Sequence, residues 1–135
     1  MSSCVLPYCL LLLITIGSIQ AKEECYSVRG KVQCAAGPTR EPTGIRVDLL
    51  DEDSLPFEKD DLMGRAWADE HGFFLVTGCG ADFGPLNTPD PYLKIVHHCP
   101  PDSNGQPSTD EKTFQVGFIP LPMPHINRLG TIYLE

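Results

Sequence analysis

Apolar and polar residues alternate in short segments along most of this chain. Between Tyr26 and Cys34, apolar or small residues at every second position are separated by Ser, Arg, Lys and Gln, which is the pattern of a half-buried β-strand. Similar short segments occur at 45–49, 92–99, 113–118 and 132–134. The segment 73–79 begins with a continuously apolar run, typical of a strand buried on both faces, and 62–69 is a weaker strand. The pattern predicts seven strands.

Gly, Pro and acidic residues separate these segments. The links include the turn-rich residues 36–43, an acidic loop at 51–61 and a polar loop at 100–110. The turn at 69–72 ends in Gly72, where a positive φ is easily accommodated, and this indicates a hairpin. Short strands at this spacing predict an all-β fold, a two-sheet antiparallel Greek-key sandwich of about seven strands.

The N-terminal residues have a different character. Residues 10–16 are apolar except Thr15, and no charged side chain occurs before Lys22. The run is too short to span a membrane and is followed by a small residue, Ala21, of the kind found at signal-peptide cleavage sites. We therefore predict a signal peptide over 1–21, one domain over 22–135, and a secreted, extracellular product with no transmembrane segment.

The charge balance narrows the class of partner. Ten Lys and Arg residues are scattered among eighteen Asp and Glu residues, for a net charge of −8. Nucleic acid is disfavoured as a partner, because a phosphate backbone selects clustered cations. Anionic membrane surfaces are disfavoured for the same reason.

Four cysteines remain after the predicted signal peptide: Cys25, Cys34, Cys79 and Cys99. An even number suits an oxidising compartment and indicates two disulfides, for which three pairings exist. A bridge within the first strand would have to span about 30 Å, far beyond disulfide geometry. If consecutive strands alternate in direction, Cys34 and Cys99 meet at one pole and Cys25 and Cys79 at the other. We predict these two bridges as staples of the sandwich.

Five blocks of the chain resemble nematode transthyretin-like proteins. They are VRGKVQC (Val28 to Cys34), PTGIRVDLLDED (Pro42 to Asp53), DDLMGRAWADEHGFFLVTG (Asp60 to Gly78), PDPYLKIVHHC (Pro89 to Cys99) and LGTIYLE (Leu129 to Glu135). The resemblance implies a secreted transthyretin-like sandwich that acts in extracellular binding or signalling, with no common catalytic site. The segment FIPLPMPHI (Phe118 to Ile126) is more apolar and proline-rich than is usual in this family.

The sequence contains no recognisable set of catalytic residues. The alternative is a secreted hydrolase, since a related branch of the transthyretin superfamily hydrolyses a purine-breakdown intermediate and carries a terminal Y-R-G-S motif. Here the chain ends in Thr131, Ile132, Tyr133, Leu134 and Glu135. No G-x-S-x-G segment occurs either, and the cysteines are assigned to bridges. We expect no enzyme activity and no cofactor.

The sequence favours neither of two conceivable metal sites. His97 and His98 adjoin Cys99, but neighbours on a strand project to opposite faces, so we expect structural or surface histidines. The carboxylates of the acidic loop could bind Ca²⁺, yet no D-x-D-x-D-G pattern is formed, and a solvated loop is the default. Trp67, the only tryptophan, is expected in the core rather than on the surface as a stacking platform.

The proline-rich segment is the candidate partner surface. Prolines hold it extended and outside a central strand, which would leave Leu121 and Met123 exposed. The residues of this surface are Phe118, Pro120, Leu121, Pro122, Met123, Pro124 and Ile126. We expect a binding or signalling protein that recognises a cell-surface protein or a small apolar or lipid ligand. A purely structural component is not supported by the acidic, non-repetitive sequence.

Overall fold

The computed structural model describes residues 22–36, 44–53, 58–82 and 88–135. The predicted signal peptide therefore lies outside the described residues. All seven predicted strands are present, with bounds β1 Lys22–Cys34, β2 Arg46–Asp51, β3 Asp61–Trp67, β4 Phe73–Asp82, β5 Pro91–His97, β6 Lys112–Val116 and β7 Asn127–Leu134. None of the described segments forms a helix with the length and apolar character needed to cross a membrane.

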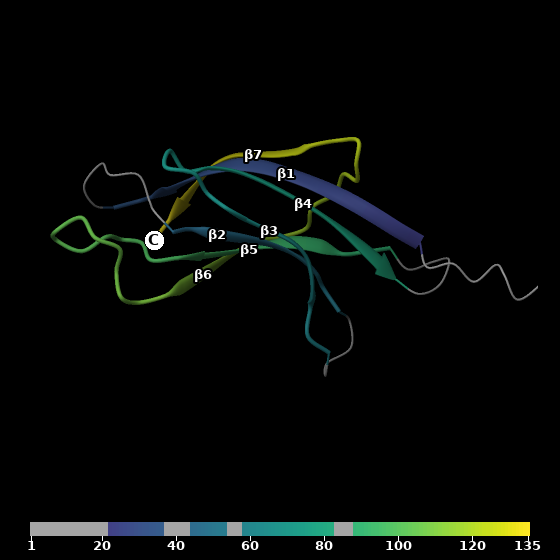
Figure 1. Cartoon of the computed structure of the whole chain (residues 1–135), viewed down its shortest axis with the longest axis horizontal. Helices are drawn as coiled ribbons and strands as arrows, with labels where there is room; N and C mark the ends of the chain where they lie inside the picture. The colour runs from purple at the N-terminus through teal and green to yellow at the C-terminus, as the bar shows by residue number, and fades with distance from the viewer. Residues whose placement is uncertain (1–21, 37–43, 54–57, 83–87) are drawn as a thin grey trace, which may run out of the picture.

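The strands form two layers, which confirms the predicted sandwich. One sheet has three strands in the order β4-β1-β7, and the other has four in the order β3-β2-β5-β6. In Figure 1 the three-stranded sheet lies above the four-stranded sheet. Its central strand β1 is the longest in the molecule, with 13 residues.

The pairing of β1 with β7 is parallel, unlike the other strand pairs. The two strands stand at opposite ends of the domain sequence, so no hairpin turn fixes their relative direction. The register aligns Val28 with Asn127 and Cys34 with Leu134, and it shifts between Arg29 and Lys31. The antiparallel expectation is thus corrected at this one pair, which brings the first and last strands side by side.

The core lies between the two sheets, and alternation along the strands fills it. On β5, Leu93, Ile95 and His97 face inward and each residue is at most 2% exposed. The apolar residues elsewhere that are 0% or 1% exposed include Val28, Val32, Ile45, Val47, Leu49, Val76, Ile119 and Leu134. Burial of each such side chain contributes about 1.5 to 3 kcal/mol to folding.

Two glycines let the sheets approach at the side where β3 meets β4. A Cβ atom built on Gly64 would collide with the backbone oxygen of Thr77, and one built on Gly78 would collide with the backbone oxygen of Met63. Backbone therefore packs against backbone at this edge. Gly72 ends the preceding turn with φ of 85°, in agreement with the sequence prediction.

Two disulfides join the strands: Cys25 with Cys79, and Cys34 with Cys99. This is the pairing expected from the alternation of strand directions. Cys25 and Cys79 are opposite each other in the β1–β4 ladder, so their bridge lies within one sheet. Cys34 ends β1, whereas Cys99 follows β5, so the second bridge joins the two sheets.

Candidate functional site

The segment from Phe118 to Ile126 runs beside the first half of β1, where β7 has not yet begun. Pro122 forms an isolated antiparallel bridge with Tyr26, and the N–H of Met123 donates to the carbonyl of Cys25 at 2.8 Å. At its start, Ile119 is 1% exposed and its N–H donates to the carbonyl of Pro91 at 2.9 Å. The segment thus covers an edge of β1 that β7 leaves unpaired.

Asn127 fastens the other end of this segment. Its side-chain oxygen accepts from the N–H of Leu121 at 3.1 Å, and its side-chain nitrogen donates to the carbonyl of Leu121 at 2.8 Å. The same nitrogen also donates to the carbonyl of Ser27 at 3.1 Å. Asn127 is itself only 5% exposed. One buried amide therefore ties the segment both to itself and to β1.

Apart from Ile119, the large apolar side chains of this anchored segment face outward. The exposed fractions are 68% for Phe118, 44% for Leu121, 51% for Met123 and 40% for Ile126. Exposed apolar side chains that lie close together on an ordered surface are typical of interaction sites. The exposure of Leu121 and Met123 agrees with the sequence prediction, whereas the role of Asn127 was not predicted because it depends on contacts across the fold.

A polar hollow of about 400 Å³ lies beside Phe118. Its lining comes from the end of β2, the start of β5 and the end of β6, and it includes Glu52, Asp60, Asp90, Tyr92, Gln115 and Phe118. Three of these side chains are carboxylates. The surface near Phe118 therefore combines an apolar side chain with negative charge.

Tyr92 and Asp60 form one wall of this hollow. The hydroxyl of Tyr92 donates to Oδ2 of Asp60, and Oδ1 of Asp60 accepts from the N–H of Asp53 at 3.1 Å. Burial, followed by the hydrogen bond and the negative charges of Asp60 and Glu52, raises the pKa of Tyr92 to about 12. The phenol stays protonated at neutral pH and holds the end of the acidic loop against β5.

The described carboxylates of the acidic loop do not converge on a common point. Among the described residues, the only group whose ligand atoms lie within 4.8 Å of one another is Glu23 with Cys25 and Cys79. Both of those cysteines are in a disulfide, so this group is not a metal site. Asp51 is 3% exposed, and its Oδ1 accepts from the N–H of Asp90 at 2.8 Å. This carboxylate fixes the start of β5 and is not solvated as expected for the loop.

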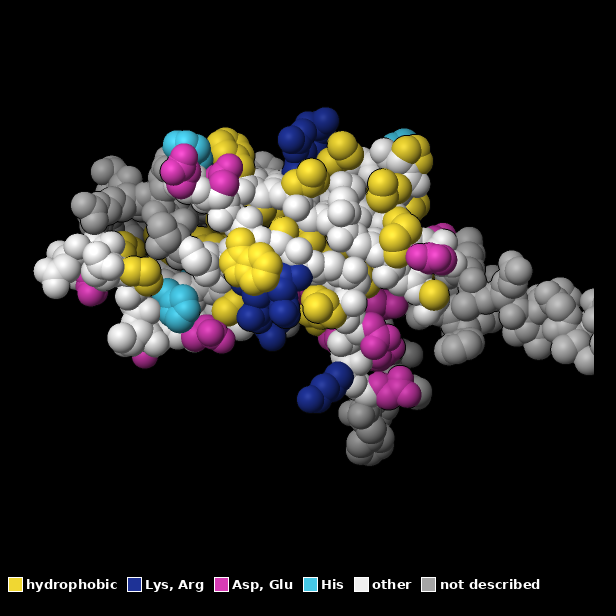
Figure 2. All heavy atoms as spheres, viewed as in Figure 1, with side chains coloured by type: hydrophobic (Ala, Val, Ile, Leu, Met, Phe, Trp, Pro, Cys, Tyr) yellow, Lys and Arg dark blue, Asp and Glu magenta, His cyan; other side chains and the backbone are white. Residues whose placement is uncertain are grey.

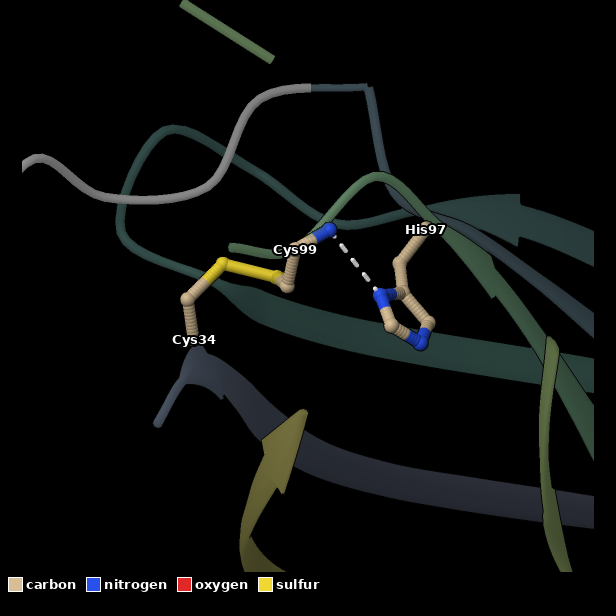
Figure 3. Close-up of a disulfide and its surroundings, with 3 residues drawn as sticks. All are labelled: Cys34, His97 and Cys99. Atoms are coloured by element: carbon tan, nitrogen blue, oxygen red, sulfur yellow. Dashed lines mark hydrogen bonds between the residues drawn. A yellow bond between two sulfur atoms is a disulfide. The ribbon is translucent and has the colours of Figure 1, made fainter. Parts of the chain in front are cut away.

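His97 belongs to the packing around the second disulfide. The side chain is 2% exposed, and its Nδ1 accepts from the N–H of Cys99 at 3.1 Å, as Figure 3 shows. Burial, with the nearby positive charge of Lys112 and then His98, lowers the pKa of His97. The ring is neutral at pH 7, and the structural role expected from the sequence is the one seen.

Trp67 contradicts its sequence prediction, because 62% of its side chain is exposed. On β3 the residue that packs against the core is Ala66, so the next residue, Trp67, points outward. Its register partner on β2 is Arg46. Because Ala66 takes the inward position, the larger indole lies on the outer face.

Beside Trp67, Asp48 pairs with two arginines on the outer face of the four-stranded sheet. Nε and Nη2 of Arg65 donate to the two oxygens of Asp48 at 2.7 and 3.1 Å. Nε of Arg46 lies 3.3 Å from Oδ2 of Asp48. The hydrogen bond to Asp48 raises the pKa of Arg65. Asp48 is only 3% exposed, so it is covered by the groups that it neutralises.

Comparison with known proteins agrees with this architecture. The sequence model of the Transthyretin-like family matches residues 29–116, which run from the middle of β1 to the end of β6. The chain belongs to the transthyretin-like family. The resemblance seen in the sequence blocks is thereby confirmed, and the matched range ends just before the 118–126 segment.

Curated relatives come from Caenorhabditis elegans. Transthyretin-like protein 46 is 32% identical over 66% of this chain and 46% of its own length. Transthyretin-like protein 33 is 32% identical over 79% of this chain and 68% of its own. Transthyretin-like protein 2 is 24% identical over 84% of this chain and 89% of its own. The chain thus spans about half the length of the first relative and more of the others.

Among solved structures, a 9R-lipoxygenase from Cyanothece PCC8801 superposes on 96% of this chain and 20% of its own, with a TM-score of 0.50 and 15% identity. At that identity the likeness concerns the fold alone. It supports the sandwich architecture and carries no argument about activity.

Proposed function

We propose that this transthyretin-like protein is a secreted, extracellular binding protein that recognises another protein through the 118–126 segment. The observation that carries the proposal is the combination of exposed apolar side chains with a backbone held at both ends and in the middle. A surface that is already ordered loses little conformational entropy on binding, so more of the contact energy is available as affinity.

The chemistry of the surroundings favours a protein over a small apolar ligand. The hollow next to Phe118 is lined by three carboxylates and a tyrosine, and a small apolar molecule would gain little by displacing water from such groups. A protein surface can place apolar side chains on Leu121 and Met123 and basic side chains near the carboxylates. The expected partner is therefore a cell-surface or matrix protein with an apolar patch bordered by Lys or Arg.

Secretion is part of the same proposal. It is supported by the signal-like residues 1–21 and by the two disulfides, which persist in oxidising compartments. Expression of the full chain in secretory cells, followed by mass spectrometry of the medium, tests this point. Recovery of a product that begins near Lys22 with both bridges formed supports secretion, and retention of the reduced full chain in the cytosol contradicts it.

The binding test compares two double variants of residues 22–135. Leu121→Asp with Met123→Asp places charge in the segment, and Leu62→Asp with Phe114→Asp places the same charge at two exposed positions elsewhere. Both are cross-linked to intact cell surfaces alongside the wild type. We expect loss of the cross-linked partner in the first variant alone. Equal capture by all three proteins would refute a role for the segment, and turnover of substrate in an esterase and amidase screen would favour the hydrolase alternative.

A further inference from the structure

The outer face of the three-stranded sheet gathers positive charge in a strongly acidic chain. Arg29 and Lys31 project from β1, and Arg128 of β7 is the register partner of Arg29. Dark blue side chains project from the upper edge of the molecule in Figure 2, where Figure 1 places this sheet, and hydrophobic side chains flank them. Only the parallel pairing of the first and last strands brings these cations together.

No ion pair joins these three cations to a carboxylate within the described part of the chain. Like charges placed directly opposite each other weaken a sheet, and the chain has eighteen acidic residues with which to balance them. On the other sheet, Asp48 forms ion pairs with both Arg46 and Arg65 and neutralises part of their charge. The cations of this face are therefore free of competing carboxylates of the described chain and are available to an anion from outside.

A groove runs between these cations. It encloses about 430 Å³ and is lined by Arg29, Gly30, Lys31, Phe73, Arg128, Gly130 and Thr131. Gly130 has φ of 69° and lies at the register shift of β7, so the bulge contributes backbone without a side chain to fill the groove. The ammonium of Lys31 lies 5.1 Å from the centre of the Phe73 ring, and Phe73 and Leu75 are each 54% exposed.

We propose that this groove binds an acidic sugar, a pyranose ring that carries a carboxylate or a sulfate, either alone or within an extracellular glycan. The planar guanidinium groups of Arg29 and Arg128 can each donate two parallel hydrogen bonds to two oxygens of a carboxylate or a sulfate. Phe73 and Leu75 offer apolar contact to the face of a sugar ring. The volume lies in the range of small-ligand sites.

Other anionic partners fit this face less well. An added peptide strand would pair along the outer edge of β7, whereas the groove lies over the face of the sheet, where β1 is hydrogen-bonded on both sides by β4 and β7. A membrane surface would bring many of the eighteen carboxylates within a Debye length of anionic lipid, which opposes binding by a chain of net charge −8. A single glycan chain can enter the groove while it avoids the acidic loops.

The test uses the double variant Arg29→Gln, Arg128→Gln. The matched control is Lys59→Gln with Lys112→Gln, which removes the same charge at exposed positions beside the four-stranded sheet. The probes are a heparin hexasaccharide, a hyaluronan hexasaccharide and sodium sulfate, measured by calorimetry. We expect the wild type and the control to bind at least one oligosaccharide. The groove variant should bind it about a hundredfold more weakly, because each of the two lost arginines removes a charge-assisted hydrogen bond that contributes roughly one tenfold step. Sulfated and carboxylated probes distinguish the two anion sources.

Two further measurements make the result decisive. Phe73→Ala should weaken the binding of the oligosaccharide but not the binding of inorganic sulfate, since only the sugar ring contacts the aromatic side chain. Equal weakening in the groove variant and the control, or no oligosaccharide binding by the wild type, overturns the proposal. Binding confined to phosphatidylserine vesicles also overturns it, in favour of a lipid headgroup. The inference goes beyond the proposed protein-binding function, and the Leu121→Asp, Met123→Asp variant should retain sugar binding.

Discussion

The two disulfides close loops of similar length but have different surroundings. Cys25 and Cys79 are 54 residues apart in sequence, and Cys34 and Cys99 are 65 residues apart, so the loss of unfolded-state entropy differs by only about 0.2 kcal/mol in the chain-entropy view. The first bridge is on the outer face of one sheet, and Cys79 is exposed. The second bridge connects the two sheets, and Cys99 is 1% exposed beside His97.

This contrast separates a structural end of the sandwich from an interacting end. Around Cys34–Cys99, packing between layers fixes the fold, and His97 is buried there as a neutral ring. Around Cys25–Cys79, the bridge reinforces strands that are already paired in register. That end also holds the exposed 118–126 segment, which hydrogen-bonds to Cys25. A fold can present a surface for partners at one end because the other end stabilises the layers.

The largest expected effect comes from removing each bridge in turn. Replacing Cys34 and Cys99 with Ala should lower the free energy of unfolding by about 4 kcal/mol or more, because a buried packing defect adds to the lost loop constraint. Replacing Cys25 and Cys79 should lower the free energy of unfolding by about 1 to 2 kcal/mol less than the first replacement, because the exposed site leaves little cavity. Urea denaturation of both variants measures the difference. Equal losses would show that loop entropy alone governs both ends.

A second change addresses how firmly the interacting end is held. Asn127→Ala removes three hydrogen bonds and leaves backbone groups of Leu121 and Ser27 unsatisfied, so we expect a loss of about 2 kcal/mol. Protease cleavage within 118–126 should accelerate. Asn104→Ala, at an exposed turn, is the matched control and should change neither quantity. Unaltered cleavage in Asn127→Ala would mean that the segment is held by other contacts.

Acid should weaken the structural end through His97. Burial lowers the pKa of this ring in the folded protein, so the unfolded chain takes up the proton first as pH falls. The free energy of unfolding should therefore be highest above about pH 6.5 and fall below it until the folded ring also titrates. His97→Gln should remove this decline between pH 7.5 and 5.5, and the exposed His125→Gln should keep it. A decline of the same size in both variants would assign it to other groups.

The smallest effect on stability is expected at the interacting surface itself. Leu121→Asp with Met123→Asp changes only exposed side chains, so the free energy of unfolding should shift by less than about 0.5 kcal/mol. Partner capture should nevertheless be lost. Thermal unfolding of the variant checks the first point. A large loss of stability would place these side chains in the packing of the fold rather than in recognition.

Local patterning was enough to predict the strands, since period-two alternation places Val28, Leu93 and Ile95 in the core whatever their neighbours are. It failed at Trp67, because the sequence of β3 does not indicate which of its residues face the core. Ala66 packs against the core and Trp67 is exposed, and nothing nearby in the sequence distinguishes this arrangement from the opposite one. The pairing of Arg29 with Arg128 was also invisible, since it depends on a parallel contact between strands about 100 residues apart.

The sequence by itself determined the seven strands, the disulfide pairing expected from their alternating directions, and the family to which the chain belongs. These features depend on periodicity and on the order of motifs, which are written along the chain. The tertiary structure decided which strands became neighbours, and hence the clamp made by Asn127, the partly neutralised face around Asp48 and the uncompensated cations beside β7. Those features depend on distances between residues far apart in sequence, and such distances exist only once both sheets have packed.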